Sequence, residues 1–473
     1  MIRLLRSRVV YPLLAGERFK GIHRRMAAIQ RFEDLPPQQQ LDQQWRKLKD
    51  MLQHAYDTVP YYRELMDTHG LPPAAIRNME DYRRLPELTR ESLRAHKQEL
   101  ISRKYQKSEL RQANTGGTTS TPMQFYRDVP ATAWKVALQW RLHAWSGYRL
   151  GDTALWMWGA KVDFSAQPSW KWSMLEKYGF GTRYLPIEGL DDATFARFVR
   201  EMRRCRPQIV YGYSNLIDLF AQYVVQNRCD IPFPKAVICT AEQLSPSQRK
   251  NIRQVLQAPV HDHYGSRETG MLGADLDGKT GMRFHGSGCL VEFIPVQRTP
   301  EGWIARLVLT DLLNRAMPFL RHNTSDCVLI QDADLNAHTA FPRADKIHGR
   351  VQDNLVLSSG KLLPGISITG SLAEHARDMA SIRSLQLVQE NIGQMTLRYV
   401  AGGNEKTTTE ELKSLETLLH AVIPDRFKLS FESMEEIPRS ASGKYRLVLS
   451  KVSASDILAT ATKKPNTPNM VQV

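Results

Sequence analysis

A run of glycines and hydroxyl residues near residue 115 is the first segment whose composition could do chemistry. Residues 114–122 read Asn-Thr-Gly-Gly-Thr-Thr-Ser-Thr-Pro. Glycines let backbone N–H groups approach a ligand closely, and threonine hydroxyls can donate to phosphate oxygens. The segment is a candidate phosphate-binding loop, although ordinary surface loops often have this composition. Its candidate nucleotide contacts are Thr115, Gly116, Gly117, Thr118 and Thr119.

A second cluster reads Tyr-Gly-Ser-Arg-Glu at residues 264–268, directly after a predicted buried strand. A carboxylate just past a strand and a glycine turn can hold Mg²⁺ beside a nucleotide phosphate. The aromatic ring could stack on a base. Tyr264 and Gly265 are therefore candidate nucleotide contacts, and Glu268 is a candidate catalytic residue and Mg²⁺ ligand. Taken alone, a glutamate after a turn is more often a solvated one.

Three more polar side chains stand near the ends of predicted elements. Asp326 closes the segment Arg-His-Asn-Thr-Ser-Asp, and its carboxylate could accept both hydroxyls of a ribose. Arg350 follows a glycine at a proposed domain boundary and could reach ribose or phosphate. Lys444 lies in the basic turn Pro-Arg-Ser-Ala-Ser-Gly-Lys-Tyr-Arg, where its ammonium could meet a phosphate. Taken alone, that turn is typical of a solvated basic loop.

Residues 273–280 match the phosphate-binding pattern G-x-x-x-x-G-K-[ST] literally, but their surroundings argue against that function. The motif needs a buried strand before it and a helix after it. Here Gly-Met-Arg-Phe-His-Gly follows, which is a poor helix start, and two aspartates inside the segment would repel phosphate. We interpret the segment as a surface turn.

Alternating helices and short strands must position these residues. Residues 27–110 have the apolar spacing of helices, and from residue 150 strands alternate with helices, as in layered α/β proteins. The predicted strands are 154–158, 209–212, 236–239 and 260–264, and the predicted helices are 131–147, 214–226 and 245–256. Segments near 290–295 and 304–310 are β-rich, and a helix is expected near 408–422.

The predicted fold class is α/β. We expect a large layered α/β N-terminal domain with a helical N-terminal region and a β-rich subdomain, plus a small mobile α+β C-terminal domain. The expected divisions are residues 1–110 for the helical N-terminal region of the large domain, 111–350 for the nucleotide- and acid-binding core, 351–455 for a small C-terminal lid domain, and 456–473 for a mobile tail.

Composition limits the function without choosing it. The 473 residues are 42% apolar and 24% charged, which is typical of a globular protein, and no apolar run is long enough to span a membrane. The net charge of +15 suits nucleotides, nucleic acids and anionic membranes alike, but no nucleic-acid-binding motif is present, so we expect no nucleic acid partner. Five dispersed cysteines without a CxxC pair favour a reducing cytoplasm over a disulfide framework or a structural zinc site.

The N-terminus combines positive charge with apolar residues. Residues 1–25 hold seven Arg or Lys and one acid, Glu17, with Leu4, Leu5, Val9 and Leu13 among them. A secretory signal would need a longer apolar core and a cleavage site of small residues. The segment is expected to be a basic first helix packed on the body, with a surface-lying amphipathic helix in peripheral contact with a membrane as the alternative.

The order of these pieces resembles the adenylate-forming superfamily of acyl- and aryl-CoA synthetases. Within it the chain looks most like the phenylacetate–CoA ligase branch, and closest to the CapK-type proteins associated with capsule or exopolysaccharide biosynthesis. The resemblance runs from about residue 40 to 450. It includes the phrases Ala-Tyr-Asp-Thr-Val-Pro-Tyr-Tyr-Arg at 55–63, Thr-Gly-Gly-Thr-Thr at 115–119, Gly-Tyr-Ser at 212–214, Ala-Glu at 241–242, Tyr-Gly-Ser-Arg-Glu at 264–268, Gly-Arg at 349–350 and Arg-Ser-Ala-Ser-Gly-Lys at 439–444.

The resemblance implies a role for each matching position. Residues 115–119 would form the phosphate loop, Ala241 and Glu242 would lie beside the adenine, Tyr264 beside the nucleotide and the acyl pocket, Glu268 on Mg²⁺, Asp326 on the ribose, Arg350 on the ribose near a hinge, and Lys444 between the carboxylate and the α-phosphate. Tyr213 and Ser214 are candidates for the wall of the acyl pocket. In this superfamily the C-terminal domain rotates between half-reactions, which would remove Lys444 and bring in the loop around Gly360.

The implied reaction is activation of a carboxylic acid by ATP and Mg²⁺ as an acyl-adenylate, with loss of pyrophosphate and transfer to a thiol, expected to be that of coenzyme A. Transfer of the acyl group or of AMP to an amine or hydroxyl, in polysaccharide or cofactor biosynthesis, is the alternative, and a non-catalytic scaffold that kept the fold is a third reading. A homodimer would be in keeping with the family.

Several positions depart from the family pattern. Ser120 and Thr121 stand where Gly-x usually precedes the proline, and Met123 replaces a common lysine. Ser325 replaces the glycine before the ribose-binding aspartate, and His322 replaces a common tyrosine. The usually acidic hinge position is Gln352. These departures predict weakened or altered adenylation. Related chains sometimes carry a Cys/His zinc cluster near His285, and because the cysteines are missing here we expect no zinc.

Overall fold

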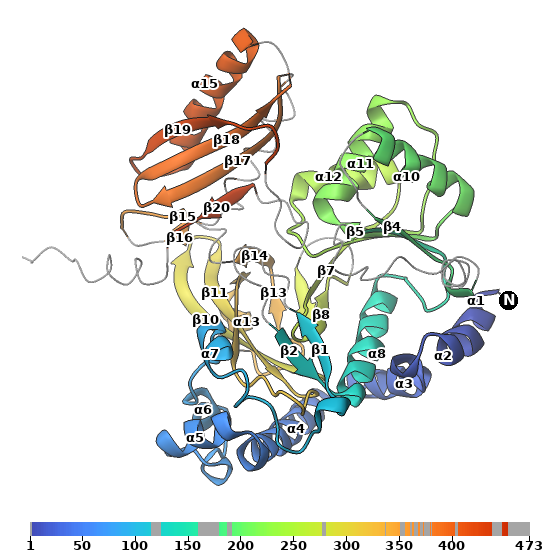
Figure 1. The fold of residues 1–473 in the computed structure, drawn as a ribbon, viewed down its shortest axis with the longest axis vertical. Coiled ribbons are helices and arrows are strands. Elements are labelled where there is room, and N and C mark those ends of the chain that lie inside the picture. The colour runs from blue at the N-terminus through green and yellow to red at the C-terminus, as the bar shows by residue number, and fades with distance from the viewer. Residues whose placement is uncertain are drawn as a thin grey trace, which may run out of the picture. The chain divides into compact units, whose positions relative to one another are not determined.

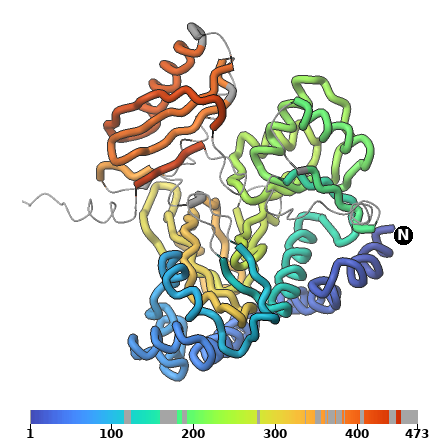
Figure 2. The backbone as a smooth tube through the Cα atoms, viewed as in Figure 1, coloured from blue at the N-terminus to red at the C-terminus, as the bar shows by residue number. Residues whose placement is uncertain are grey.

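The computed structural model describes residues 2–114, 124–158, 179–186, 192–276, 281–335, 337–350, 355–359, 362–363, 368, 372, 379, 381–402, 405–437 and 447–452. The chain divides into two compact units, of which the first holds Met1–Ile347 and the second begins at His348. Each unit is described by itself below (Figures 1 and 2).

The first unit begins with the helical region expected from the sequence. Its elements are α1 (Ile2–Leu5), η1 (Arg6–Val10), α2 (Tyr11–Leu14), η2 (Glu17–Phe19), α3 (Ile22–Glu33), α4 (Pro37–Thr58), α5 (Pro60–Thr68), η3 (Pro73–Ala75), α6 (Met79–Arg83), α7 (Arg90–Ala95) and η4 (Lys107–Glu109). Apolar side chains of α4 recur at helical spacing, among them Leu48, Met51, Leu52 and Ala55, and they share one core with residues 317–320. The helical region is therefore part of the first unit's core.

An eight-stranded sheet forms the centre of this unit. Its strand order is β13-β9-β8-β7-β6-β5-β3-β4, and the strands are β3 (Ala154–Trp158), β4 (Thr182–Pro186), β5 (Ile209–Tyr213), β6 (Ala236–Thr240), β7 (Val260–Ser266), β8 (Gly270–Ala274), β9 (Met282–Phe284) and β13 (Arg343–Ala344). From β4 to β7 neighbouring strands are parallel, and from β7 to β13 they are antiparallel.

Helices cover both faces of the sheet, because the inner strands bury alternate side chains on opposite faces. Val210 and Val237 pack in a core with α10 (Asp192–Cys205), α11 (Ser214–Gln226) and α12 (Pro246–Leu256). Ile209 and Ile238 point to the other face, where α3 and α8 (Val129–Trp145) pack (Figure 1). The strands and helices predicted between residues 150 and 264 are confirmed, with bounds that differ by at most two residues.

A second, antiparallel sheet supplies the β-rich subdomain. Its order is β10-β11-β12-β14, and the strands are β10 (Cys289–Thr299), β11 (Gly302–Asp311), β12 (His322–Ile330) and β14 (Lys346–Arg350), with α13 (Asp332–Leu335) after β12. A separate hairpin pairs β1 (Arg111–Asn114) with β2 (Gln124–Arg127). The two segments that the sequence predicts to be β-rich are thus adjacent, paired strands of one sheet.

The second unit is a small α+β structure. Its sheet has the order β19-β18-β17-β20, formed by β17 (Ile382–Asn391), β18 (Gln394–Ala401), β19 (Lys428–Ser433) and β20 (Val448–Ser450), beside the pair β15 (Leu355–Val356) and β16 (Leu362–Leu363). The helix α15 (Glu405–Val422) buries Leu415 and Leu419 against Leu387 and Leu397 of the sheet. The predicted fold class is confirmed, with a layered α/β first unit and a small α+β second unit.

Candidate active site

The carboxyl ends of three parallel strands bring three of the predicted motifs into one row. In the register of the sheet, Tyr213 of β5 pairs with Thr240 of β6, which pairs with His263 of β7. The next residues along each strand are Ser214, Ala241 and Tyr264. In open α/β sheets ligands bind in the crevice outside the carboxyl ends of the strands, so this edge is the expected place for a nucleotide.

Glu242 and Ser214 connect two of these strand ends. The Ser214 hydroxyl donates to the backbone oxygen of Glu242 over 3.1 Å, and the Asn215 backbone N–H donates to the Glu242 carboxylate over 3.2 Å. A carboxylate at the first turn of α11 is stabilised by the helix dipole. Ser214 is buried, as is Tyr213, whose ring centroid lies 4.8 Å from that of Trp158. Their expected place in an acyl pocket stays a prediction.

Ala241 has a left-handed backbone, with φ of 67°. This conformation costs a residue with a Cβ about 1–3 kcal/mol and persists where the surrounding structure fixes it. It turns the chain sharply after β6. Two residues later, the side chain of Gln243 donates to the backbone oxygen of Ile347 over 2.5 Å. This hydrogen bond connects the turn to β14.

Tyr264 and Asp326 meet although they are 62 residues apart and lie in different sheets. The Tyr264 hydroxyl donates to Oδ2 of Asp326 over 2.5 Å. Asp326 follows Ser325 in an irregular part of β12, where the pairing with β11 shifts register and Ser325 has φ of 65°. The Ser325 N–H donates to the Asn323 side chain over 2.9 Å. The two predicted nucleotide contacts are therefore neighbours in the fold.

Glu268 lies in the tight turn between β7 and β8, with its side chain buried. Burial raises the pKa of its carboxyl, but the positive charges of His322 and Arg90 and hydrogen bonds from its own N–H and Ser266 lower that pKa below the ordinary value. Burial lowers the pKa of His322, and the negative charge of Glu268 opposes that shift. Glu268 is thus held ionised, as a ligand of Mg²⁺ must be.

A buried lysine of α8, which the sequence analysis did not identify as a site residue, holds the turn between β7 and β8 in place. Lys135 of α8 donates through Nζ to the backbone oxygen of Glu268 over 3.0 Å and to Oδ2 of Asp311 over 2.5 Å. The side chains of Lys135 and Asp311 are only 6% and 1% exposed. Burial lowers the pKa of Lys135, while Asp311 raises it. The backbone of the candidate metal ligand is therefore joined to a buried ion pair.

Two arginines lie where the hairpin β1–β2 meets the same turn. Arg267 donates to the backbone oxygen of Asn114 over 3.4 Å. Arg127, at the end of β2, stacks over Phe125, and burial lowers the pKa of its guanidinium while Asp311 and Glu268 raise it. Its Nε is buried without a hydrogen-bond partner in the part of the chain that the structure describes. Both residues stand near the ends of the predicted phosphate loop.

Several predicted site residues lie outside the described part of the chain. They are Thr115, Gly116, Gly117, Thr118, Thr119, the departures Ser120, Thr121, Met123 and Gln352, Gly360, and Lys444. The backbone of Arg350 ends β14, but its side chain is not described. Of the pattern resembling a phosphate-binding loop at 273–280, Gly273 and Ala274 belong to strand β8, and residues 277–280 are outside the description.

His285, near which related chains can carry zinc, makes an ion-pair network. Its Nε2 lies 2.9 Å from Oε1 of Glu33, its Nδ1 accepts from Ser287, and Arg141 donates to the same glutamate through two nitrogens. Within the described ranges, no three His, Cys, Asp or Glu side chains are grouped to hold a metal ion. The expectation of no zinc stays a prediction, and the described contacts of His285 are structural.

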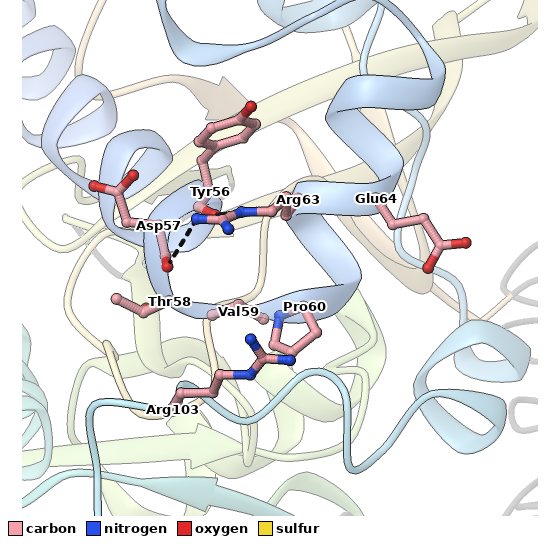
Figure 3. Close-up of a pocket in the computed structure, with 8 residues that line it drawn as sticks. All are labelled: Tyr56, Asp57, Thr58, Val59, Pro60, Arg63, Glu64 and Arg103. Carbon is pink, nitrogen blue, oxygen red and sulfur yellow. Dashed lines mark hydrogen bonds between the residues drawn. The ribbon is translucent and has the colours of Figure 1, made fainter.

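A cavity of about 300 Å³ lies elsewhere in the first unit, where α4 meets α5 (Figure 3). It is lined by Tyr56, Asp57, Thr58, Val59, Pro60, Arg63, Glu64 and Arg103. The guanidinium of Arg63 donates hydrogen bonds to the backbone oxygens of Tyr56 and Asp57. No lining residue belongs to the row at the strand ends, so we do not take this cavity for the active site.

Comparison with known proteins agrees with this geometry. Residues 365–451 match the CapK C-terminal domain family. Protein CapK of Staphylococcus aureus is 22% identical over 397 residues, which cover 83% of this chain and 85% of that protein. The phenylacetate-coenzyme A ligase of Escherichia coli K12 is 25% identical over 346 residues, covering 68% and 73%. The chain is a relative of CapK and of the phenylacetate-coenzyme A ligases.

The fold is that of the adenylate-forming CoA ligases, as the resemblance implied. A crystal structure of 2-hydroxyisobutyryl-CoA ligase in its postadenylation state, in complex with 2-HIB-AMP, superimposes with a TM-score of 0.68 and 18% identity over 91% of this chain and 93% of that one. The same enzyme in its thioesterification state, with 2-HIB-AMP and CoA, gives 0.57 over 88% and 90%. These relatives and this fold are those of ligase-type enzymes, which confirms the predicted enzyme class.

Proposed function

We propose that this protein activates a carboxylic acid with ATP as an acyl-adenylate, releases pyrophosphate, and transfers the acyl group to the thiol of coenzyme A. The observation that carries the proposal is the contact between Tyr264 and Asp326, beside a Glu268 that is buried and held ionised. Two motifs that lie 62 residues apart in the sequence, Tyr-Gly-Ser-Arg-Glu at 264–268 and the segment ending in Asp326, thus converge where a nucleotide is expected.

The residues would divide the work between binding and charge stabilisation. Asp326 would accept the ribose hydroxyls, and Tyr264, oriented by its hydrogen bond to Asp326, would face the nucleotide and the acyl group. Glu268 would hold Mg²⁺, which when bound offsets negative charge on the phosphates. Residues 115–119, Ala241, Glu242, Gly265 and Arg350 are the further proposed nucleotide contacts. Lys444 would bridge the carboxylate and the α-phosphate, and positioning and charge would carry the catalysis.

The acceptor divides two candidate functions. Coenzyme A is favoured because the phenylacetate-coenzyme A ligases match over two thirds of the chain. The match to CapK covers more of the chain, and residues 365–451 match the CapK C-terminal domain. Since CapK-type proteins are associated with capsule or exopolysaccharide biosynthesis, transfer to an amine or hydroxyl acceptor is the alternative proposal. A non-catalytic scaffold is disfavoured, because an ionised Glu268 and the Tyr264–Asp326 pair are kept.

The first test is ATP–pyrophosphate exchange with Mg²⁺ across a panel of aryl, fatty and amino acids. We expect one acid class to stimulate exchange, and Glu268→Gln to lower it about a hundredfold or more. The matched control is Glu64→Gln, which changes a glutamate of the cavity in Figure 3 and should leave exchange unchanged. Exchange lost equally in both variants would refute the assignment of Glu268. Absence of both exchange and ATP binding would favour the scaffold.

The second test identifies the acceptor. Acid, ATP and either CoA or a panel of amines and sugars are incubated together, and the products are separated and weighed by mass spectrometry. Thioester formation supports the ligase, whereas an amide, ester or adenylylated product supports the alternative. Lys444→Ala should lose adenylation yet still convert a supplied acyl-adenylate, and equal loss of both half-reactions would contradict the proposed domain rotation. The proposal has three further parts. Residues 351–455 would act as a lid on the site. The protein would form a homodimer and would be located in the cytoplasm.

A further inference from the structure

The first helical segment carries an exposed apolar stripe. Six large apolar side chains of residues 2–14 are between 43% and 73% exposed: Ile2, Leu4, Leu5, Val9, Leu13 and Leu14. Across the described ranges only five other large apolar side chains are exposed, and they are scattered from Val225 to Phe431. Single exposed apolar residues are normal, whereas a contiguous patch marks an interaction surface.

The opposite side of this segment is fixed to the body. Ser7 and Tyr11 are buried, and the Tyr11 hydroxyl donates to the backbone oxygen of Phe180 over 3.4 Å. Leu5, Val9 and Leu13 recur every four residues and therefore share one face of the helix, and Ser7 and Tyr11 are offset by two residues, on the other side. The apolar stripe consequently points away from the protein.

A glycine on the body makes this docking possible. A Cβ added at Gly151 would lie 2.5 Å from the backbone oxygen of Arg3, and the φ of Gly151 is +94°. Only glycine accommodates both the close approach and the left-handed backbone. The segment therefore packs closely against Gly151, and the described residues leave its apolar side uncovered.

Exposed positive charge is concentrated in the same N-terminal part of the chain. Arg8, Arg18, Lys20 and Arg24 are exposed, and Glu17 is the single acid among the first 25 residues. We propose that this face, defined by the six apolar residues and these four cations, binds the surface of an anionic phospholipid membrane. Apolar side chains would enter the interface between headgroups and acyl chains while arginines and lysines meet lipid phosphates. This inference is independent of the proposed enzymatic activity.

The charges favour a lipid surface over a second copy of the chain. A twofold dimer would bring the same cations of both copies toward each other, which is unfavourable. Contact with the membrane is peripheral in this proposal. Within the described residues no helix is long and apolar enough to cross a membrane.

The test is flotation of the full-length protein with vesicles of phosphatidylcholine alone or with about one third phosphatidylglycerol. We expect binding to the anionic vesicles only, weakened by raising NaCl from about 0.1 M to about 0.5 M because the Debye length shortens. Val9→Ser with Leu13→Ser should lower the apparent affinity at least about tenfold, a factor that corresponds to about 1.4 kcal/mol. Arg8→Gln with Arg18→Gln should reduce the preference for anionic vesicles.

Matched controls keep the proposal falsifiable. Val225→Ser with Phe233→Ser changes two exposed apolar residues elsewhere in the first unit and should bind like the parent protein. Equal loss in the control pair, equal binding to neutral vesicles, or no binding to either vesicle would overturn the proposal. A dimer in sedimentation velocity that Val9→Ser with Leu13→Ser abolishes, without vesicle binding, would identify a second copy as the occupant instead.

Discussion

Lys135→Met tests whether the buried ion pair beneath the β7–β8 turn positions Glu268. The substitution keeps the length of the side chain and removes the ammonium, which donates to Asp311 over 2.5 Å and to the backbone oxygen of Glu268 over 3.0 Å. Removing one partner of a buried pair costs about 3–5 kcal/mol, because the remaining charge is left unpaired. Asp311 would keep hydrogen bonds from the N–H groups of Leu313 and Asn314 to its other oxygen, Oδ1. We therefore expect a cost near the lower end of that range, about 3 kcal/mol.

The lost hydrogen bond to Glu268 adds about 1 kcal/mol. We therefore expect a loss of about 4 kcal/mol in the free energy of unfolding of the first unit, measured by urea denaturation followed by tryptophan fluorescence. The matched control is Lys47→Met. Lys47 donates to the backbone oxygen of Ser287 over 2.7 Å, and its Nζ has no carboxylate partner in the described structure. Its substitution should cost about 1 kcal/mol.

A second readout separates positioning from stability. At a temperature where the variant is still folded, Lys135→Met should slow pyrophosphate exchange by about a hundredfold, since a displacement of about 1 Å in a catalytic group costs that much. The Mg²⁺ concentration for half-maximal exchange should rise as well. Asp311→Asn combined with Lys135→Met should recover stability but not exchange. If Lys135→Met costs no more stability than Lys47→Met, or leaves exchange and its Mg²⁺ dependence unchanged, the reasoning is wrong.

Three further predictions follow from single contacts. Arg127→Met should raise the KM for ATP about tenfold with a smaller effect on kcat, whereas Arg111→Met, its exposed cross-strand partner in the hairpin, should change neither in steady-state assays. Ser325→Gly should relieve a left-handed backbone and stabilise the first unit by about 0.5–1 kcal/mol in urea, while Ser325→Ala, which keeps the strain, should not. Burial lowers the pKa of His143 to about 3, so the native state resists protonation and stability falls as pH drops below about 6.5, by up to about 1.4 kcal/mol per pH unit. His143→Phe should flatten that dependence between pH 6.5 and 5 in urea titrations, and an unchanged slope would contradict it.

The elements of the central sheet could be predicted because burial leaves a local signature. Ala236–Thr240 is buried at every position, so its run of apolar residues marks a strand covered on both faces. Ser245, the N-cap of α12, and Pro246, its first residue, mark where the helix begins, and the structure shows the full capping box there, with Ser245 accepting from the Gln248 N–H. Such signals act over a few residues and need no knowledge of the tertiary fold.

The partners of the site residues could not be predicted in the same way. Lys135 belongs to the helix α8, and a lysine in a helix is typical of the solvent-exposed side. Its burial is possible because it pairs with the carboxylate of Asp311, which lies 176 residues further along the chain. Likewise, Glu33 pairs with His285 across 252 residues. Such pairs form only when two sheets and a helix pack together, so single-sequence patterns carry no trace of them. The family resemblance predicted Tyr264, Glu268 and Asp326 as site residues, but it did not predict the contacts that hold them in place.

The departures from the family pattern have different expected effects in different parts of the proposed site. They fall near the proposed ribose and metal residues and in the phosphate loop. At Ser325 a residue with a Cβ adopts the left-handed backbone that a glycine would adopt more easily, and Asp326 still reaches the hydroxyl of Tyr264. We therefore expect the serine to change the stability of this irregular part of β12 rather than its shape. His322 likewise remains beside Glu268, buried and with its pKa lowered. Because the proposed ribose and metal residues keep their described contacts despite these departures, we expect weakened adenylation to originate in the phosphate loop or at the hinge position Gln352. Replacing Ser120 by glycine tests the phosphate loop directly, since it should restore adenylation if the loop is the cause.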